Sequence, residues 1–231
     1  MEVSNKDINN LRLRKIKSII FKAIVWLCGI LTVGILVYIL LFILIRGLPK
    51  INMEFLFGEY NSKNLSAFSS IVTTIEMIVI SLLISVPIGV FCAIYLTEYS
   101  KRGNKAVKVI RLAVDTLAGI PSIIYGLFGM IFFVNVLGFR ASVISGIGTI
   151  SIMILPVIIS SSEEAIKSVP DTYREGSYGL GATRLRTVFK IVLPTAIPGI
   201  LAGVILAIGR IVGETAALIF TSGTNVMKEP T

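Results

Sequence analysis

Five long apolar runs alternate with charged segments along this chain. The runs contain no Asp, Glu, Lys or Arg and lie at residues 23–45, 77–97, 116–139, 141–162 and 191–209. A helix needs about 20 apolar residues to cross a bilayer core of about 30 Å, and each run is long enough. The pattern therefore predicts an all-α fold, a polytopic membrane helix bundle.

With their flanking residues, the runs predict five membrane spans. A tail covers residues 1–18, a transmembrane domain covers residues 19–231, and the longest loop covers residues 163–190. The spans lie at about 19–46, 71–97, 112–139, 141–162 and 191–221. The basic residues before the first run resemble the start of a signal peptide, but the run is too long for one and no small-residue cleavage site follows. We therefore expect an uncleaved anchor helix.

Prolines occur within four of the five predicted spans. Pro87, Pro121 and Pro156 lie inside the second, third and fourth spans, and Pro198 lies near the start of the fifth. Each proline removes one backbone hydrogen bond and kinks its helix, and small residues such as the recurrent glycines let helices approach closely. The pattern predicts kinked, closely packed helices, with bending for alternating access as the functional interpretation.

The amino-acid composition excludes several classes of protein for this chain. Apolar residues make up 55% of the chain and charged residues 15%, whereas soluble domains have about 25% charged residues. The absence of His excludes His-based triads and His zinc sites, and no G-x-x-x-x-G-K-[ST] loop occurs. Cys28 and Cys92 both lie in apolar runs and cannot form a disulfide framework. We expect neither an enzyme nor a cofactor in this chain.

The basic residues predict the orientation. The net charge is +9, and sixteen of the 22 Lys and Arg precede the first apolar run, follow the second span or lie in the 163–190 loop. The positive-inside rule places these segments and the N-terminus in the cytoplasm. We therefore expect a multi-pass protein of a prokaryotic plasma membrane, in contact with lipid and not with nucleic acid.

The long loop predicts a short helix–turn–helix. Pro170 can start a helix, with Asp171 in its first turn. Gly179 and Gly181 break that helix, and Thr183 is a candidate cap for the next. A surface amphipathic helix touching anionic lipid is the plainer alternative.

The spacing in this loop favours a more specific interpretation. The segment Glu175-Gly176-Ser177-x3-Gly181-x9-Ile191-x-Leu193-Pro194 resembles the cytoplasmic signature of binding-protein-dependent ABC permeases, which reads E-A-A-x3-G-x9-I-x-L-P. Gly-Ser replaces Ala-Ala, which keeps both side chains small. The resemblance implies a coupling helix, seated in a groove of an ATPase subunit, that involves Glu175, Gly176, Ser177, Gly181, Ile191, Leu193 and Pro194.

Other segments narrow the resemblance. Residues 117–129, 153–156 and 207–217 resemble permeases of phosphate transporters. Short motifs at residues 47–49, 93–99 and 194–199 favour the A-type (PstA-like) subunit over the C-type subunit. The implied fold is that of a type I ABC importer permease with a cytoplasmic coupling helix.

The resemblance also implies partners. These are a second permease subunit (PstC-like), ATPase subunits (PstB-like) that hold ATP and Mg²⁺, and an extracytoplasmic phosphate-binding protein. The family pattern has a sixth span that this sequence does not show. From that departure we expect a fragment, a truncated product or a shortened variant.

Two charges fall within the fifth span. Arg210 and Glu214 are four residues apart, so we expect them to share a helix face. Charges inside a membrane are expensive and mark candidate functional sites, and the planar fork of Arg suits a phosphate. We expect Arg210 and Glu214 to lie on the substrate path, with Ser122 and Tyr125 around Pro121 as further lining candidates. A structural ion pair and ordinary helix packing are the alternatives.

The leading interpretation is therefore a membrane subunit of an ATP-driven phosphate importer. An importer of another oxyanion, such as sulfate or molybdate, is the nearest alternative. A stand-alone secondary transporter or channel would work without an ATPase and would have no use for the 175–194 signature. A non-transporting truncated fragment is the third alternative.

Overall fold

The computed structural model describes residues 5–58, 66–100 and 104–223, and none of these residues forms a β-strand. The chain divides into two compact units, residues 1–67 and 68–231. The predicted all-helical architecture is confirmed. Among the described residues, four helices are long and apolar enough to cross a membrane, and a fifth span is added if one bent helix pair is counted as one.

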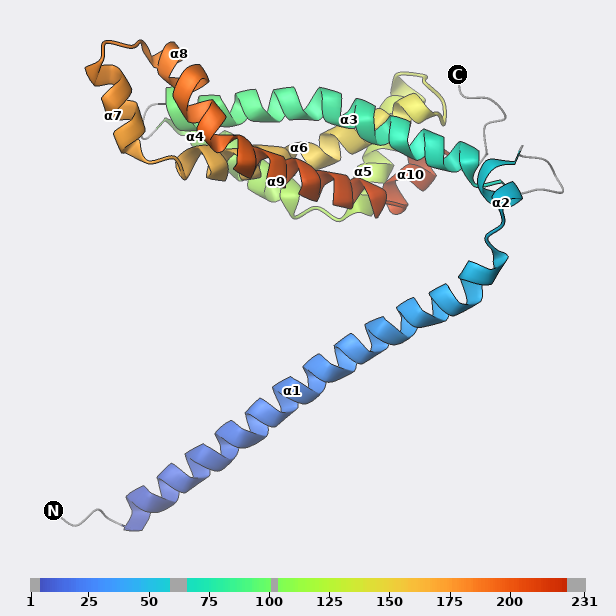
Figure 1. Cartoon of the computed structure of the whole chain (residues 1–231), viewed down its shortest axis with the longest axis vertical. Coiled ribbons are helices and arrows are strands. Elements are labelled where there is room, and N and C mark those ends of the chain that lie inside the picture. The colour runs from blue at the N-terminus through green and yellow to red at the C-terminus, as the bar shows by residue number, and fades with distance from the viewer. Residues whose placement is uncertain (1–4, 59–65, 101–103, 224–231) are drawn as a thin grey trace. The chain divides into compact units, whose positions relative to one another are not determined.

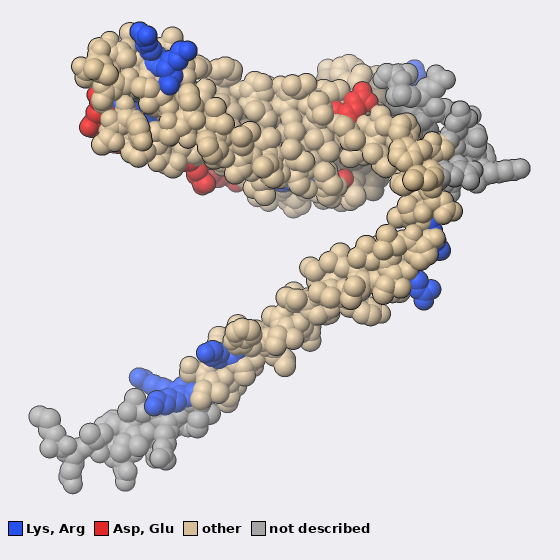
Figure 2. All heavy atoms as spheres, viewed as in Figure 1, with Lys and Arg blue, Asp and Glu red and all other residues tan. Residues whose placement is uncertain are grey.

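One long helix dominates the N-terminal unit. α1 covers Asn5–Gly47, a 3₁₀ turn follows at Leu48–Lys50, and α2 covers Met53–Phe57. Every side chain from residue 17 to residue 46 is exposed, and basic side chains lie toward the two ends of the helix (Figure 2). A helix that is apolar on all sides requires an apolar environment around it. α1 is therefore suited to lipid or to the helices of a partner, as expected for an anchor. The helix also takes in residues 5–18, which were expected as a tail.

The C-terminal unit is a bundle of eight helices in the described part of the chain. Their bounds are α3 Phe68–Ile94, α4 Lys105–Ala118, α5 Ser122–Gly129, α6 Val143–Lys167, α7 Asp171–Gly179, α8 Arg184–Thr187, α9 Leu193–Val212 and α10 Ala216–Thr221. π-helical turns at Tyr95–Tyr99, Met130–Val136 and Val188–Val192 extend α3, α5 and α8. Figure 1 shows α7 and α8 at one end of this unit and α10 near the other.

α6 is the central helix of this bundle. It packs against both α3 and α9, and its side chains Ile150, Met153, Ile154 and Ile158 are almost completely buried. Buried hydroxyls join the helices as well, because Ser85 Oγ donates a hydrogen bond of 2.9 Å to a carbonyl of α6. The long apolar run at 141–162 is thus the core of the bundle, and α6 continues five residues beyond it.

Small residues set the closest helix contacts. A Cβ atom at Gly89 of α3 would lie 2.6 Å from the side chain of Ile158. A Cβ atom at Gly203 of α9 would collide with the side chain of Ser161. The glycines therefore let α3 and α9 approach α6 more closely than any side chain would permit, as predicted.

The third expected span is not one straight helix. α4 ends at Ala118, Pro121 immediately precedes α5, and the two helices are bent by 103°. Pro121 lacks a backbone N–H and adopts an extended ψ of 140°. The Tyr125 hydroxyl bridges the break by donating a 2.8 Å hydrogen bond to the carbonyl oxygen of Leu117. The single span expected at 112–139 is thus a bent helix pair.

The fifth expected span is also interrupted. The helix begins at Arg184, runs through the π-helical turn into α9 and ends at Val212. A separate short helix, α10, follows at Ala216–Thr221 and packs against α5. The continuous helix expected over 191–221 is therefore wrong after residue 212.

Candidate functional site

α7 and α8 form a helical hairpin between α6 and α9, called here the α7–α8 hairpin (residues 171–187). Pro170 precedes α7, and Gly181 in the turn has a φ of +80°, which favours glycine. The Thr183 side chain accepts a hydrogen bond from the backbone N of Arg186 and caps α8. The predicted helix–turn–helix is confirmed with the starting and breaking residues that the sequence indicated.

The two arms of the hairpin are joined by buried hydroxyls. Ser177 Oγ and Thr187 Oγ1 lie 2.8 Å apart and share a hydrogen bond. Thr187 Oγ1 also donates to the carbonyl oxygen of Thr183. Ser177, the second small residue of the signature, is therefore used inside the hairpin and is not available on its surface.

The other signature residues of α7 lie on the outer surface. Glu175 and Gly176 are exposed, and a Cβ atom at Gly176 would meet no other atom within 4 Å. Apolar side chains lie exposed around them: Leu180 is 91% exposed, and Tyr178 and Leu185 are exposed as well. The hairpin thus presents a mixed surface, on which Glu175 and the exposed Arg184 and Arg186 lie among apolar side chains, with room at residue 176.

Arg174 anchors the hairpin at its base. Its Nε and Nη2 donate to Glu98 Oε1 at 3.0 and 2.8 Å. Its Nη1 donates to the Val169 carbonyl and to Asp171 Oδ1, and Nη2 donates to the Ile166 carbonyl. All five N–H groups of a guanidinium can donate, and here all five have an acceptor. Arg174 therefore joins α7 to the end of α3 and to the end of α6.

A second ionic cluster lies nearby. Glu163 Oε1 of α6 forms salt bridges with Arg111 Nη2 of α4 at 2.8 Å and with Lys167 Nζ at 2.7 Å. The Glu163 side chain is 11% exposed. The carboxylate thus ties α4 to the end of α6 from which the hairpin projects.

Arg210 and Glu214 do not share a helix face. Arg210 lies in the last turn of α9, whereas Glu214 lies beyond Gly213, which ends that helix. The Glu214 carboxylate accepts a 3.0 Å hydrogen bond from the backbone N of Ala217 in the first turn of α10. No ion pair joins the two charges in the part of the chain that the structure describes. The expected shared face is wrong because it assumed a continuous helix.

The other two predicted path residues differ in exposure. Tyr125 is buried in the core with Ala207 and Ile211 of α9, and its hydroxyl is engaged with the α4 carbonyl across the break. Ser122 is half-buried at the start of α5. Tyr125 therefore packs beside the segment that carries Arg210, but its hydroxyl is occupied by a structural hydrogen bond.

No metal site accompanies these residues. Over the described ranges, no three His, Cys, Asp or Glu side chains lie close enough to hold a metal ion.

Comparison with known protein families assigns the chain. Residues 85–229, well over half of the sequence, match the family described as binding-protein-dependent transport system inner membrane component. The chain belongs to this family. This permease is therefore a multi-pass membrane component of an ABC importer, and the prediction of a transporter subunit in place of an enzyme is confirmed.

Individual relatives agree with the assignment. The permease is 35% identical over 214 residues to the probable ABC transporter permease protein YqgI of Bacillus subtilis, covering 91% of this chain and 72% of that protein. It is 34% identical over 209 residues to the phosphate transport system permease protein PstA of Pasteurella multocida, covering 89% and 70%. A PstA homolog of Mycoplasma pneumoniae is 36% identical over 206 residues, but this chain spans 85% of its own length and only 31% of that protein.

Solved structures support the fold. A chain of the methionine ABC transporter MetNI in an inward-facing conformation superposes with a TM-score of 0.52 at 24% identity. The superposition covers 64% of the permease and 68% of that chain. The bundle is thus that of an ABC importer permease.

The end of the signature lies apart from the exposed hairpin surface. Ile191 and Leu193 are half-buried where α8 runs into α9, and Leu193 packs against the core cluster beside them. Pro194 is the second residue of α9, a position that tolerates its missing N–H. The signature of this permease therefore combines a surface part at residues 175–176 with a part that fixes the helix leaving the hairpin.

Sequence reasoning did not single out Glu98, Arg174 or Glu163 as anchors of the permease hairpin. Glu98 is 5% exposed although it directly follows an apolar run. Two signals for this ion pair were available in the sequence: a carboxylate directly after an apolar run, and an Arg directly before Glu175 in the signature. Its partner could not be chosen among the many basic residues on the same predicted side.

Proposed function

We propose that this permease is the PstA-like subunit of an ATP-driven phosphate importer, and that its α7–α8 hairpin docks in a groove of the ATPase. The observation that carries the proposal is the exposed surface around Glu175, Gly176 and Leu180 on a hairpin fixed from below by Arg174. An exposed apolar surface on a rigid support is typical of a protein interface. Closure of the ATPase pair would move the hairpin, and α6 and α9 would move with it.

The small size of residue 176 supports docking. None of the residues that the structure describes requires a glycine there, because the space beside it is open, and glycine weakens a helix by about 1 kcal/mol relative to alanine. A glycine with this penalty and no internal packing role fits a surface on which another chain approaches closely. The orientation follows the positive-inside rule, with the hairpin in the cytoplasm.

The substrate proposal depends on relatives and on Arg210. Two of the relatives described above are named as phosphate transport permeases. Arg210 is half-buried in α9 and has neither a hydrogen bond nor an ion pair among the described residues. An unpaired guanidinium within a span suits an anion that must bind and leave, because it offers charge-assisted hydrogen bonds without a fixed competitor. Glu214, held by its bond to α10, would lie beside this path.

The assembly would contain a second permease, two ATPase subunits with ATP and Mg²⁺, and an extracytoplasmic phosphate-binding protein. The test is uptake of ³²P-phosphate by a strain that lacks its own A-type permease and expresses this chain with these partners. We expect uptake that unlabelled phosphate suppresses and that sulfate and molybdate do not. Uptake suppressed by sulfate would contradict phosphate as the substrate, and uptake without the ATPase would contradict the ABC mechanism.

A further inference from the structure

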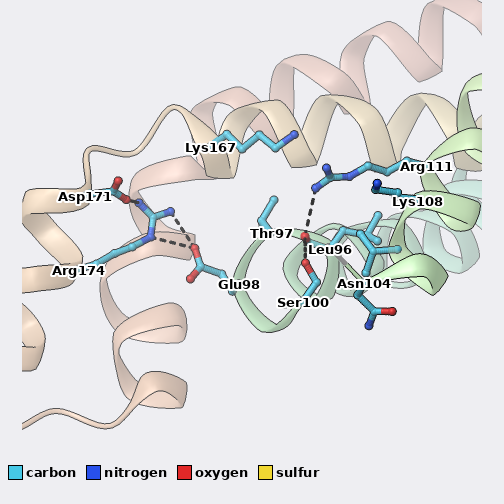
Figure 3. Close-up of a pocket in the computed structure, with 11 residues that line it drawn as sticks. Leu96, Thr97, Glu98, Ser100, Asn104, Lys108, Arg111, Lys167, Asp171 and Arg174 are labelled. Atoms are coloured by element: carbon cyan, nitrogen blue, oxygen red, sulfur yellow. Dashed lines mark hydrogen bonds and ion pairs between the residues drawn. The ribbon is translucent and has the colours of Figure 1, made fainter. Parts of the chain in front are cut away.

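A polar pocket lies beside the base of the α7–α8 hairpin (Figure 3). It is formed by the end of α3, by α4, by the end of α6 and by the start of α7, and its volume is about 520 Å³. Small-molecule sites have volumes of about 300–1,000 Å³. We propose that this pocket binds a phosphate group, carried either by an anionic phospholipid or by free inorganic phosphate.

The lining of the pocket is rich in positive charge. Four basic side chains contribute to it: Lys108, Arg111, Lys167 and Arg174. Figure 3 shows Lys108 and Arg111 extending from α4 toward the space that Lys167 enters from α6. Of the four, Lys108 makes no ion pair with any described residue. A free ammonium beside other cations favours an anionic occupant.

The nearby carboxylates do not cancel this charge. Glu98 and Asp171 are both bound by Arg174. Glu163 is shared by Arg111 and Lys167. Even with Glu163, which pairs with two of the cations without lining the pocket, three carboxylates accompany four cations, so the net charge of the group is positive and favours an anion.

Donors remain for such a ligand. Arg111 uses Nη2 for both of its contacts, with Glu163 and with the Leu96 carbonyl oxygen at 3.3 Å. Its Nη1 has no hydrogen bond to the residues that the structure describes, and 43% of the side chain is exposed. Lys167 is 53% exposed despite its salt bridge. Phosphate oxygens accept several charge-assisted hydrogen bonds at once, so guanidinium and ammonium groups together match the ligand.

α4 gives the pocket an apolar flank. Val109 and Leu112 are 65% and 68% exposed on the helix that also carries Lys105 and Lys108. Leu112 follows Lys108 by four residues, so an exposed apolar and a basic side chain lie side by side on one face of α4, and the 103° bend toward α5 takes α4 out of line with the next helix. Basic pockets between helices on the cytoplasmic side bind lipid headgroups. A phospholipid could therefore place its phosphate in the pocket and its chains beside α4, whereas free phosphate would use the pocket alone.

The position of the pocket suggests what the ligand does. Arg174 and Asp171 line it and also fix the base of the hairpin. A bound phosphate would therefore hold α4, the end of α6 and the hairpin together and stiffen the support of the docking surface. This inference does not depend on the transported substrate.

The test uses the full-length chain purified in detergent. Native mass spectrometry measures binding of short-chain phosphatidylglycerol against phosphatidylcholine, and equilibrium dialysis measures binding of inorganic ³²P-phosphate. Lys108→Gln removes the unpaired charge in the pocket, and Lys105→Gln removes an exposed charge of the same helix outside the pocket lining. We expect Lys108→Gln to weaken binding about fivefold, the effect of one basic residue near a phosphate surface, and Lys105→Gln to leave it within about twofold.

The two probes distinguish a phospholipid from free inorganic phosphate as the source of the bound phosphate group. A loss confined to phosphatidylglycerol identifies a lipid headgroup, and a loss confined to inorganic phosphate identifies the free ion. Equal losses in both variants would show diffuse surface charge and overturn the pocket. No loss with either probe in Lys108→Gln, and none in the stronger variant Lys108→Glu, would overturn it as well. Because Lys108 is exposed, thermal unfolding of these variants should match that of the unaltered chain.

Discussion

Arg174 and Glu98 form an ion pair although 76 residues separate them. The Arg174 side chain is 14% exposed and that of Glu98 is 6% exposed. The remaining guanidinium N–H groups bind carbonyls at the end of α6 and a carboxylate in α7. Arg174 therefore fixes the α7–α8 hairpin to the end of α3 and to the end of α6 at once.

Glu98→Gln should loosen this anchor. Removal of one partner leaves the other charge poorly compensated and costs about 3 kcal/mol in buried pairs. Asp171→Asn is the matched control, because Asp171 pairs with the same Arg but is 86% exposed, and exposed pairs contribute about 1 kcal/mol or less. The measurement is the free energy of unfolding in detergent. Similar losses in the two variants would contradict the anchoring role of Glu98.

Two glycines of α9 should respond in opposite directions to alanine. At Gly203 the added Cβ collides with Ser161 of α6, so Gly203→Ala should destabilise the chain by about 1–3 kcal/mol. At Gly209 the space is open, so Gly209→Ala should leave stability unchanged or raise it by up to about 1 kcal/mol. Thermal unfolding of the two purified variants checks the sign. A neutral Gly203→Ala would show that α9 does not pack on α6 as closely as described.

Gly176→Leu should separate folding from docking. Residue 176 is exposed and an added Cβ would meet no described atom within 4 Å, so expression and thermal unfolding should be unchanged. It would fill the surface beside Glu175, so the ATPase subunit should no longer co-purify with the permease. Gly209→Leu, in open space on α9, is the control and should retain the ATPase. Co-purification of the ATPase with Gly176→Leu would show that residue 176 is not at the interface.

The sequence predicted features whose signals are local. Pro170, Gly181 and Thr183 each act on the backbone within a few residues, so the helix–turn–helix can be derived from the sequence alone. The apolar runs indicated α1, α3, α6 and α9 in the same way, because the length of an apolar run shows whether a helix made from it can span a bilayer.

Features that depend on tertiary packing were not predicted. Pro121 indicated a kink, but the 103° angle between α4 and α5 depends on how α5 packs against α10 and α6. Arg210 and Glu214 were placed on one face because four residues make about one helical turn, whereas Gly213 ends the helix between them. The Glu98–Arg174 pair joins distant segments, and without contacts no spacing rule selects one partner.

Transport itself tests the central claim most directly. The assembled complex is reconstituted into liposomes with ATP inside the lumen that the ATPase faces, and ³²P-phosphate uptake is measured for the unaltered chain, for Arg210→Gln and for Arg140→Asn. Arg140 is an exposed Arg with a left-handed φ of 59°, a conformation that Asn tolerates. We predict ATP-dependent uptake that Arg210→Gln abolishes without loss of assembly and that Arg140→Asn preserves. Normal uptake by Arg210→Gln, or uptake of equal rate without ATP, would contradict a phosphate path past Arg210 driven through the hairpin.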